Sequence, residues 1–301
     1  QLHGGNGNDT LSFDQAERKR NQYTRFDGAR VNLATGTIFE IDYRPLPEDP
    51  PNLNYEFMTM TGFENLIGTP HVDSLTGDDG PNIINPLGNG RTSLEEHVPA
   101  DEVDGGAGLD TLRVDYSKNP LANQYGVDMY APAGLTSGNS ILTRGNLLPS
   151  LSVILKHTGF ERFEVTGGDG PDRLLTVIGL NVGLDTSYPD ILHGGGGDDQ
   201  IYSGHGDDLV TGGDGNDVIE LDGGNDTAFG GPGNDQITVE FTLEVVDPDR
   251  GLGSDLIDAG PGDAFVSEIP RGWPTQPRAY LAPSPSRLRL AGATGFDSLS
   301  A

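Results

Sequence analysis

The chain of 301 residues is acidic and poor in apolar side chains: 34% of its residues are hydrophobic, 45 are glycine, and its formal net charge is −28. This composition excludes an ordinary globule with a large apolar core, and without internal order it would indicate disorder. The charge disfavours nucleic acid and anionic membrane as partners and favours cations, while the absence of cysteine excludes disulfides and thiolate metal sites.

The first patterned segment is GGNGNDTLS, residues 4–12, a glycine-rich turn with Asp9 in sixth place and three residues suited to a strand. Glycine allows the positive φ of a sharp turn, and a three-residue strand points only its middle side chain inward. A short basic run at 16–25 is expected to be a solvated loop. Residues 29–42 read as β-strands around a polar turn, and the prolines of 44–54 indicate a surface loop.

The same pattern returns in less regular form over the next hundred residues. GGAGLDTLRVD (105–115) nearly duplicates GGNGNDTLSFD (4–14), and TGFER (158–162) duplicates TGFEN (61–65), so a unit of about 100 residues occurs twice. Each copy carries an insert that reads as longer β-strands, such as SLSVILKHTGFERFEV in the second. The rows of these units have sixth-place residues Asp9, Asp73, Asn82, Asp101, Asp110 and Asp172.

Residues 185–238 form six consecutive rows of nine, and a further degenerate row places Asp255 in sixth position. The rows are DTSYPDILH, GGGGDDQIY, SGHGDDLVT, GGDGNDVIE, LDGGNDTAF and GGPGNDQIT. Each has an aspartate sixth and an apolar residue eighth, which is the nine-residue GGxGxDxUx pattern. The segment from 174 to 270 holds 20 acidic residues and one basic residue, Arg250. A sequence repeat as regular as this one indicates a folded segment and argues against disorder.

These rows resemble the calcium-binding nonapeptides of the repeats-in-toxin (RTX) family. The resemblance implies an all-β parallel β-roll, here with longer β-strand inserts, and calcium ions in the turns. It also implies secretion, of the type I kind, to the exterior or cell surface. The implied ligands are the aspartates Asp190, Asp199, Asp208, Asp217, Asp226 and Asp235 with carbonyls of Gly194, Gly196, Ser203, His205, Gly212 and Asp214, and further sites near Asp9, Asp73, Asp101, Asp110, Asp172 and Asp255.

Physical chemistry supports a cation independently. Two rows make an 18-residue coil, so aspartates 18 apart, such as Asp199 and Asp217, stack about 4.8 Å apart. Two such charges repel by about 3 kcal/mol at an effective dielectric near 20, whereas each row buries about one aliphatic side chain worth roughly 1.5–3 kcal/mol. Calcium accepts carboxylate and carbonyl oxygens at flexible geometry, and its binding energy adds to folding.

The repeats predict four parts. These are a first repeat unit (1–103), a second repeat unit (104–184), a contiguous calcium β-roll array (185–266) and a tail containing proline and arginine (267–301). Because the chain opens inside a glycine-rich row, we expect it to be a piece of a longer protein. The tail has the composition of a disordered end, a cap over the last coil or a secretion signal, and the sequence leaves these alternatives open.

We therefore expect a calcium-stabilised extracellular module, structural or adhesin-like, that folds after secretion and has no catalytic residue. Its partners are calcium and, as a further candidate, polysaccharide or a cell surface, without nucleic acid or membrane insertion. YGVDMY (125–130) shares only part of the catalytic motif of secreted mannuronan C5-epimerases, since the proline and histidine are missing. The alternative is the non-catalytic calcium β-roll part of a secreted enzyme: a protease, a lipase or a polysaccharide-modifying enzyme such as a mannuronan epimerase.

Overall fold

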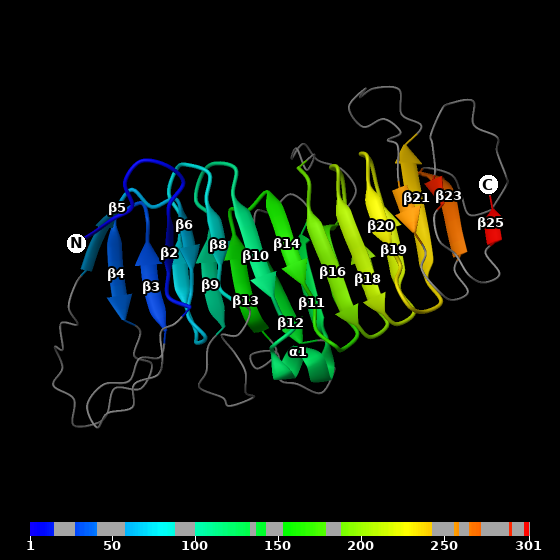
Figure 1. The fold of residues 1–301 in the computed structure, drawn as a ribbon, viewed down its shortest axis with the longest axis horizontal. Coiled ribbons are helices and arrows are strands. Elements are labelled where there is room, and N and C mark those ends of the chain that lie inside the picture. Colours follow the sequence, from blue (N-terminus) through cyan, green and yellow to red (C-terminus); the bar gives the residue numbers. More distant parts are fainter. Residues whose placement is uncertain are drawn as a thin grey trace. The chain divides into compact units, whose positions relative to one another are not determined.

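A computed structural model of the chain consists almost entirely of short β-strands (Figure 1). The chain divides into two compact units, 1–121 with 136–162, and 122–135 with 163–301. Contacts define this division, so the four parts predicted from the repeats stay predictions. The structure describes residues 1–14, 28–40, 58–87, 100–132, 137–142, 153–178, 188–242, 256–258, 265–271, 289–290 and 298–300.

The first unit contains two rows of strands. Its first sheet has the order β1 (Leu2–His3), β5 (Met58–Thr61), β4 (Thr37–Glu40), β3 (Ala29–Asn32), β7 (Ser74–Thr76), β9 (Asp101–Asp104), β13 (Val153–Thr158), β12 (Ser137–Leu142). Its second sheet has the order β2 (Thr10–Ser12), β6 (Asn65–Ile67), β8 (Ile83–Asn85), β10 (Thr111–Asp115). The template strands pair in parallel, while the pairs β3–β4, β4–β5 and β12–β13 are antiparallel. The inserts thus contribute hairpin strands to the first sheet.

The second unit repeats the arrangement with parallel pairs throughout its array. One sheet has the order β11 (Val127–Pro132), β15 (Arg173–Ile178), β17 (Gln200–Tyr202), β19 (Val218–Leu221), β21 (Gln236–Thr242), β23 (Phe265–Arg271), β25 (Ser298–Ser300). The other has the order β14 (Arg162–Thr166), β16 (Ile191–Gly196), β18 (Leu209–Asp214), β20 (Thr227–Phe229), β22 (Leu256–Asp258), β24 (Arg289–Leu290). The helix in the described part of the chain is α1 (Pro120–Tyr125).

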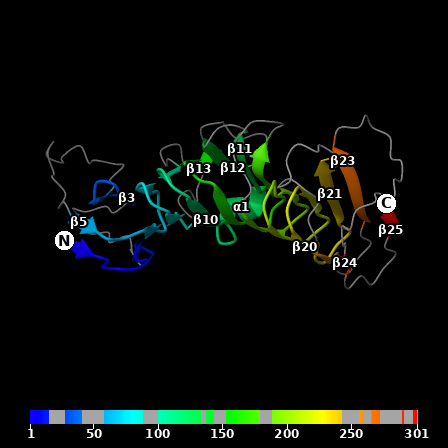
Figure 2. The ribbon, with the colours of Figure 1, turned by 90° about the horizontal axis from the view of Figure 1, so that it is seen from above.

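The predicted 18-residue coil is confirmed by the strand register. Ile201 lies opposite Ile219, and Ile219 opposite Ile237, while Leu192 lies opposite Val210 on the other wall. Successive coils of the array therefore stack on one another, as Figure 2 shows from above. The fold is an all-β parallel β-roll, as the nonapeptides predicted.

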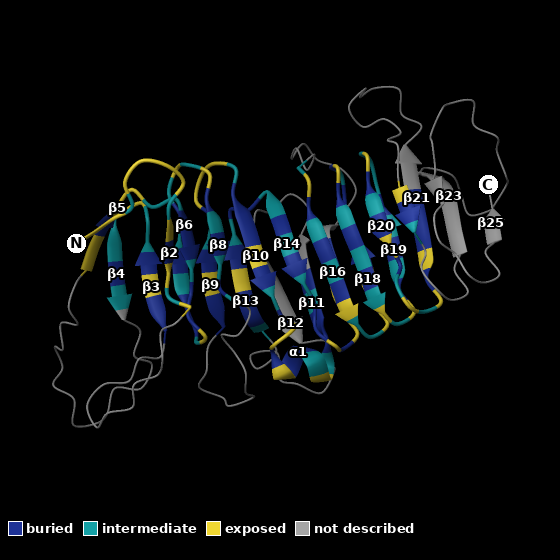
Figure 3. Ribbon diagram, viewed as in Figure 1, coloured by how far each residue is buried: buried dark blue, intermediate teal, exposed yellow. Residues whose placement is uncertain are grey.

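The interior of the array is narrow. The six side chains at eighth place are fully buried: Leu192, Ile201, Val210, Ile219, Ala228 and Ile237. Leu221, at first place of its row, is fully buried as well. Their neighbours along each strand are more exposed, which gives the alternation visible in Figure 3. The first unit buries larger groups, including Met60, Phe160 and Tyr116. The array therefore depends less on apolar burial than the first unit does.

Several strands of the array, β16 and β18 among them, are longer than the three residues that the sequence predicted. β16 and β18 are six residues long because their pairing continues past the template strand into the glycines, with Gly195 opposite Gly213 and Gly196 opposite Asp214. Gly213 and Gly215 have φ values of 119° and 145°, which favour glycine. A Cβ at either position would also collide with a carbonyl of the preceding coil. Among the described residues, no helix is long and apolar enough to cross a membrane.

Candidate metal centres

The sixth-place aspartates form ladders of side-chain to backbone hydrogen bonds between coils. Asp199 N–H donates to Asp217 Oδ1 at 2.9 Å, and Asp217 N–H donates to Asp235 Oδ1 at 2.9 Å. The opposite edge has the same ladder, from Asp190 to Asp208 at 2.9 Å and from Asp208 to Asp226 at 3.0 Å. One carboxylate oxygen of each acceptor thus binds a backbone group of the coil before it.

The second carboxylate oxygen has a different environment. Asp199, Asp217 and Asp235 are at most 2% exposed, and the Oδ2 atom of each is buried without a hydrogen-bond partner. An ionised oxygen left bare in this way is costly, because burial removes its hydration and nothing replaces it. Three such oxygens along one edge indicate a positive group that completes the site.

A glycine-lined cradle lies beside the Oδ2 atoms of Asp199 and Asp217. A Cβ at Gly194 would overlap Asp199 Oδ2 and would lie 2.5 Å from the Gly212 carbonyl oxygen. Gly212 has the same relation to Asp217 Oδ2 and the Gly230 carbonyl. Each cradle therefore brings together a carboxylate oxygen and the carbonyl of the next coil, which are the hard oxygen donors that calcium prefers.

A family model described as the RTX calcium-binding nonapeptide repeat (4 copies) matches the chain over residues 1–15, 185–219 and 204–237. This chain carries RTX calcium-binding repeats. The match covers the array and the opening row, where the cradles and bare oxygens are found. A comparison with curated proteins gave no match.

The resemblance predicted sites made of ladder aspartates and turn carbonyls. No group of three or more histidine, cysteine, aspartate or glutamate side chains suited to a metal occurs in the described segments. Gly194 and Gly196 lie in β16, and Gly212 and Asp214 in β18, where Asp214 O accepts a hydrogen bond from Gly197 N–H. Ser203 and His205 lie in the turn before β18. Their roles as carbonyl ligands stay predictions.

The RTX-like rows outside the array also lie in register with neighbouring rows, but more residues of the chain separate each pair. Asp73 N–H donates to Asp101 Oδ1, and Asn82 N–H to Asp110 Oδ1, each across 28 residues. Asp172 N–H donates to Asp199 Oδ1 across 27 residues. The longer coils accommodate extra residues between rows without breaking the ladder.

These outer rows differ in how their carboxylates are satisfied. Asp73 accepts hydrogen bonds on both oxygens, from Ala29 N–H and from the backbone and hydroxyl of Thr69. Asp172 accepts from Val127 N–H on Oδ1 and from Gly168 N–H on Oδ2. Internal donors therefore meet part of the need for a cation at these two positions. The Oδ2 atoms of Asp9 and Asp110 are buried without a partner, and Asp255 lies outside the described residues.

Burial raises the pKa of the aspartates in the RTX ladder. Desolvation is the main cause for Asp199, whose pKa rises from 3.8 to about 8, and for Asp208 and Asp217, whose pKa rises to about 6. Neighbouring carboxylates add to the rise, while the ladder hydrogen bonds oppose it. At neutral pH the fold without a cation must therefore either protonate these groups or hold unfavourable charge.

A pH dependence follows from the sign of these shifts. The folded state binds protons more tightly than the unfolded chain, so its stability without calcium is greatest near pH 4 and falls as pH rises towards 8. We expect the melting temperature in chelator, followed by circular dichroism, to be higher at pH 5 than at pH 8. Saturating calcium should weaken or reverse this trend, since it requires ionised carboxylates. A melting temperature in chelator that drops on acidification would contradict the assignment.

A second ladder, which the sequence pattern did not reveal, runs beside the RTX aspartates at fifth place. Asn216 N–H and its side-chain amide both donate to Asp198 Oδ1, and Asn234 N–H donates to Asn216 Oδ1 at 3.0 Å. Asn225 makes the same pair of bonds to Asp207. The ND pairs of the later rows thus place a neutral amide over a carboxylate. The clue in the sequence was this change from DD to ND between successive rows.

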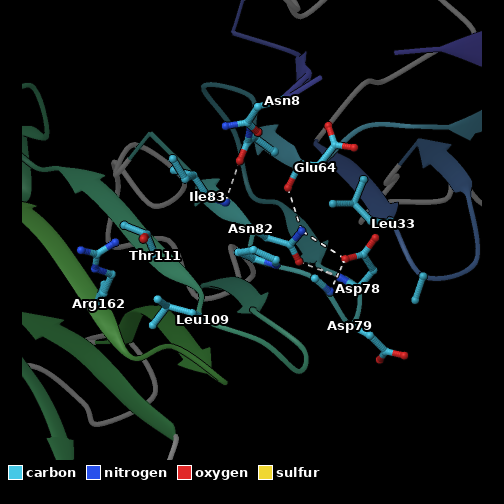
Figure 4. A pocket seen from close by; sticks show the side chains of 14 residues that line it. Asn8, Leu33, Glu64, Asp78, Asp79, Asn82, Ile83, Leu109, Thr111 and Arg162 are labelled. Atoms are coloured by element: carbon cyan, nitrogen blue, oxygen red, sulfur yellow. Dashed lines mark hydrogen bonds between the residues drawn. The ribbon is translucent and has the colours of Figure 1, made fainter. Parts of the chain in front are cut away.

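A polar cavity of about 740 Å³ lies in the first unit (Figure 4). In this view Arg162 and Thr111 line one side, and Glu64, Asp78 and Asp79 line the other. The Nε atom of Arg162 is buried and has no hydrogen-bond partner. The cavity therefore has a guanidinium group on one side and several carboxylates on the other.

Proposed function

We propose that this chain is a calcium-dependent extracellular structural module that folds after secretion. The observation that supports it best is the row of buried, unpartnered Oδ2 atoms on Asp199, Asp217 and Asp235, the first two of them beside glycine cradles. Calcium, when bound there, supplies positive charge that both stacked carboxylates and the turn carbonyls share. Without it, like charges about 5 Å apart oppose stacking by roughly 3 kcal/mol per pair.

The mechanism is a response to the environment. In a cytosol with submicromolar calcium, the aspartates repel one another and keep the array open, a state suited to export. Sites of extracellular affinity, with dissociation constants of about 10⁻⁴–10⁻³ M, fill outside the cell, and the coils then stack. Removal of calcium tests the proposal, because β-structure that is complete in chelator would exclude such a response.

The proposal assigns no catalysis to this chain. The ladder aspartates of the array bind backbone groups of neighbouring coils, an arrangement suited to a scaffold. The same module would serve equally well in an adhesin or as the non-catalytic part of a secreted protease, lipase or polysaccharide-modifying enzyme. Assays of the chain on alginate-like polymers would expose a catalytic role.

The cavity of the first unit supports a second candidate function, contact with a polysaccharide. Sugar hydroxyls both donate and accept hydrogen bonds, and they match a lining that includes Arg162 together with carboxylates such as Asp79. We expect neutral oligosaccharides to bind in the presence of calcium and Arg162→Gln to weaken binding at least fivefold, measured by calorimetry. Equal affinity for the variant, or no glycan binding by the wild type, would exclude this role for the cavity.

A further inference from the structure

The two duplicated T-G-F-E segments place a glutamate where the array has an aspartate. Asp9 N–H donates to Glu64 Oε2 at 2.7 Å, and Asp110 N–H donates to Glu161 Oε2 at 2.9 Å. In the array the corresponding N–H of Asp199 donates to the carboxylate of Asp217, one full coil further on. Each glutamate thus takes the position of the next rung in the ladder.

The backbone around each glutamate follows the array as well. The first glycine of a row, Gly167, donates its N–H to the carbonyl of His193 and abuts the carbonyl of the following residue, Gly194. Gly105 N–H likewise donates to Thr158 O and abuts the Gly159 carbonyl. The opening row has the same contacts, from Gly4 to Thr61 and Gly62.

The array rows and the T-G-F-E segments differ in how many residues separate the glycine carbonyl from the carboxylate that follows it. In the array the two are five residues apart, as in Gly194 and Asp199, whereas Gly159 and Glu161 are only two apart. The backbone reaches the rung all the same, because Arg162 N–H donates to Asp110 O at 3.1 Å as Val218 N–H does to Asp199 O, and the longer glutamate side chain accepts the rung hydrogen bond there. T-G-F-E therefore acts as a compressed row.

Both compressed rows lie against an aspartate whose second oxygen is bare. Asp110 is fully buried, and its Oδ2 has no hydrogen-bond partner. Asp9 Oδ2 is also buried and unpartnered, and it lies 4.0 Å from the Cβ positions of both Gly5 and Gly7, over the turn of its own row. These oxygens need a positive partner as those of the array do.

The coil between them shows how the same position is satisfied without an ion. Asn82 occupies the sixth place of its row, and its Nδ2 donates to the Glu64 carbonyl at 2.8 Å and to Asp78 Oδ1 at 3.3 Å. Its Oδ1 accepts from Asp78 N–H. An amide thus supplies donor and acceptor together, whereas Asp9 and Asp110 have no internal donor for their second oxygen.

We propose that Asp110 with Glu161, and Asp9 with Glu64, form two calcium sites of a second type, each closed by the glutamate of a compressed row and a glycine carbonyl. The inference rests on the proposed calcium binding of the array and extends it to a motif that the nonapeptide template does not contain. It also gives the inserts a role, because an insert can leave and rejoin the roll where a compressed row closes the site.

Calorimetric calcium titration of the full chain, with ions counted by native mass spectrometry, tests the proposal. Glu64→Gln and Glu161→Gln keep an oxygen that accepts the ladder hydrogen bond but remove the charge. We expect each to lose one calcium ion, or to bind it at least tenfold more weakly, with an unchanged melting temperature in chelator. Glu161→Asp keeps the charge but shortens the side chain, and it should lose the same ion.

Asp217→Asn in the array provides the matched control, because it removes one array carboxylate and leaves both glutamates in place. Full stoichiometry in Glu64→Gln and Glu161→Gln, together with a loss in Asp217→Asn, would overturn the two glutamate sites while the array sites stand. Full stoichiometry in Glu161→Asp would refute the compressed-row geometry and the proposal with it. A wild-type chain that binds no calcium would overturn the proposed function itself.

Discussion

Chelation of calcium is expected to speed amide hydrogen exchange in the array, residues 188–242, by at least a hundredfold, with a much smaller change over residues 58–87. The array amides bond between coils, as Val218 N–H does to Asp199 O and Gln236 N–H to Asp217 O. They exchange when the coils separate. One site held at 100 times its dissociation constant adds about 2.7 kcal/mol to stability, a factor of about one hundred.

The contrast between the two segments follows from what holds each together. Most array rows bury one aliphatic side chain, and the row of Ala228 adds only Leu221. Residues 58–87 bury Met60, Leu66, Val72, Leu75 and Ile84, and their sixth-place groups have internal partners. Apolar burial and internal donors therefore sustain this segment when calcium is removed, while stacked carboxylates drive the array apart.

Exchange measured by mass spectrometry in chelator, in calcium and in magnesium separates charge screening from site binding. Magnesium requires a tighter octahedron and retains its waters, so we expect it to restore little of the protection. Equal protection of residues 188–242 in chelator and in calcium would show that the array holds its shape without the ion. Full rescue by magnesium would indicate general screening in place of built sites.

Sequence was sufficient to predict the repeating part of this fold. The nine-residue period fixed which residues turn inward and which aspartates stack, and the register of Ile201, Ile219 and Ile237 agrees. Glycine spacing sets the backbone conformation locally, so the turn and the strand of each row can be predicted from that row alone. The RTX match supports the same conclusion for residues 185–237.

The parts that were not foreseen depend on contacts between rows distant in the chain. Thr69 satisfies Asp73, and Glu64 bonds to Asp9 across 55 residues, yet neither pairing is visible in the nonapeptide itself. The extension of β16 into Gly194–Gly196 likewise depends on the coil stacked against it. The nonapeptide template predicts the backbone conformation within one row. It does not predict which neighbouring coil supplies the hydrogen-bond donor to each carboxylate.

Variants of Asp217 separate the two proposed roles of a ladder aspartate. Its Oδ1 accepts a backbone hydrogen bond, and its Oδ2 binds a cation. Asp217→Ala removes the acceptor of Asp199 N–H and should cost about 1–3 kcal/mol of stability even in chelator, because it leaves that buried donor unsatisfied. Asp217→Asn keeps an acceptor oxygen and replaces the bare Oδ2 by an uncharged amide. In chelator it should match or exceed the wild type, since it removes repulsion from Asp199 and Asp235.

Calcium should reverse the order of the wild type and Asp217→Asn. With the ion present, the wild type gains the binding energy of the site, and both variants fall below it, because neither retains the charge that binds the cation. Urea unfolding of the three proteins in chelator and in calcium measures this directly. Asn82, whose amide already closes its coil with internal hydrogen bonds, shows that the substituted state is structurally accessible in this roll. If Asp217→Asn were as destabilised in chelator as Asp217→Ala, the ladder carboxylate would serve the fold through its charge alone, and the separate role of Oδ2 in holding a cation would be lost.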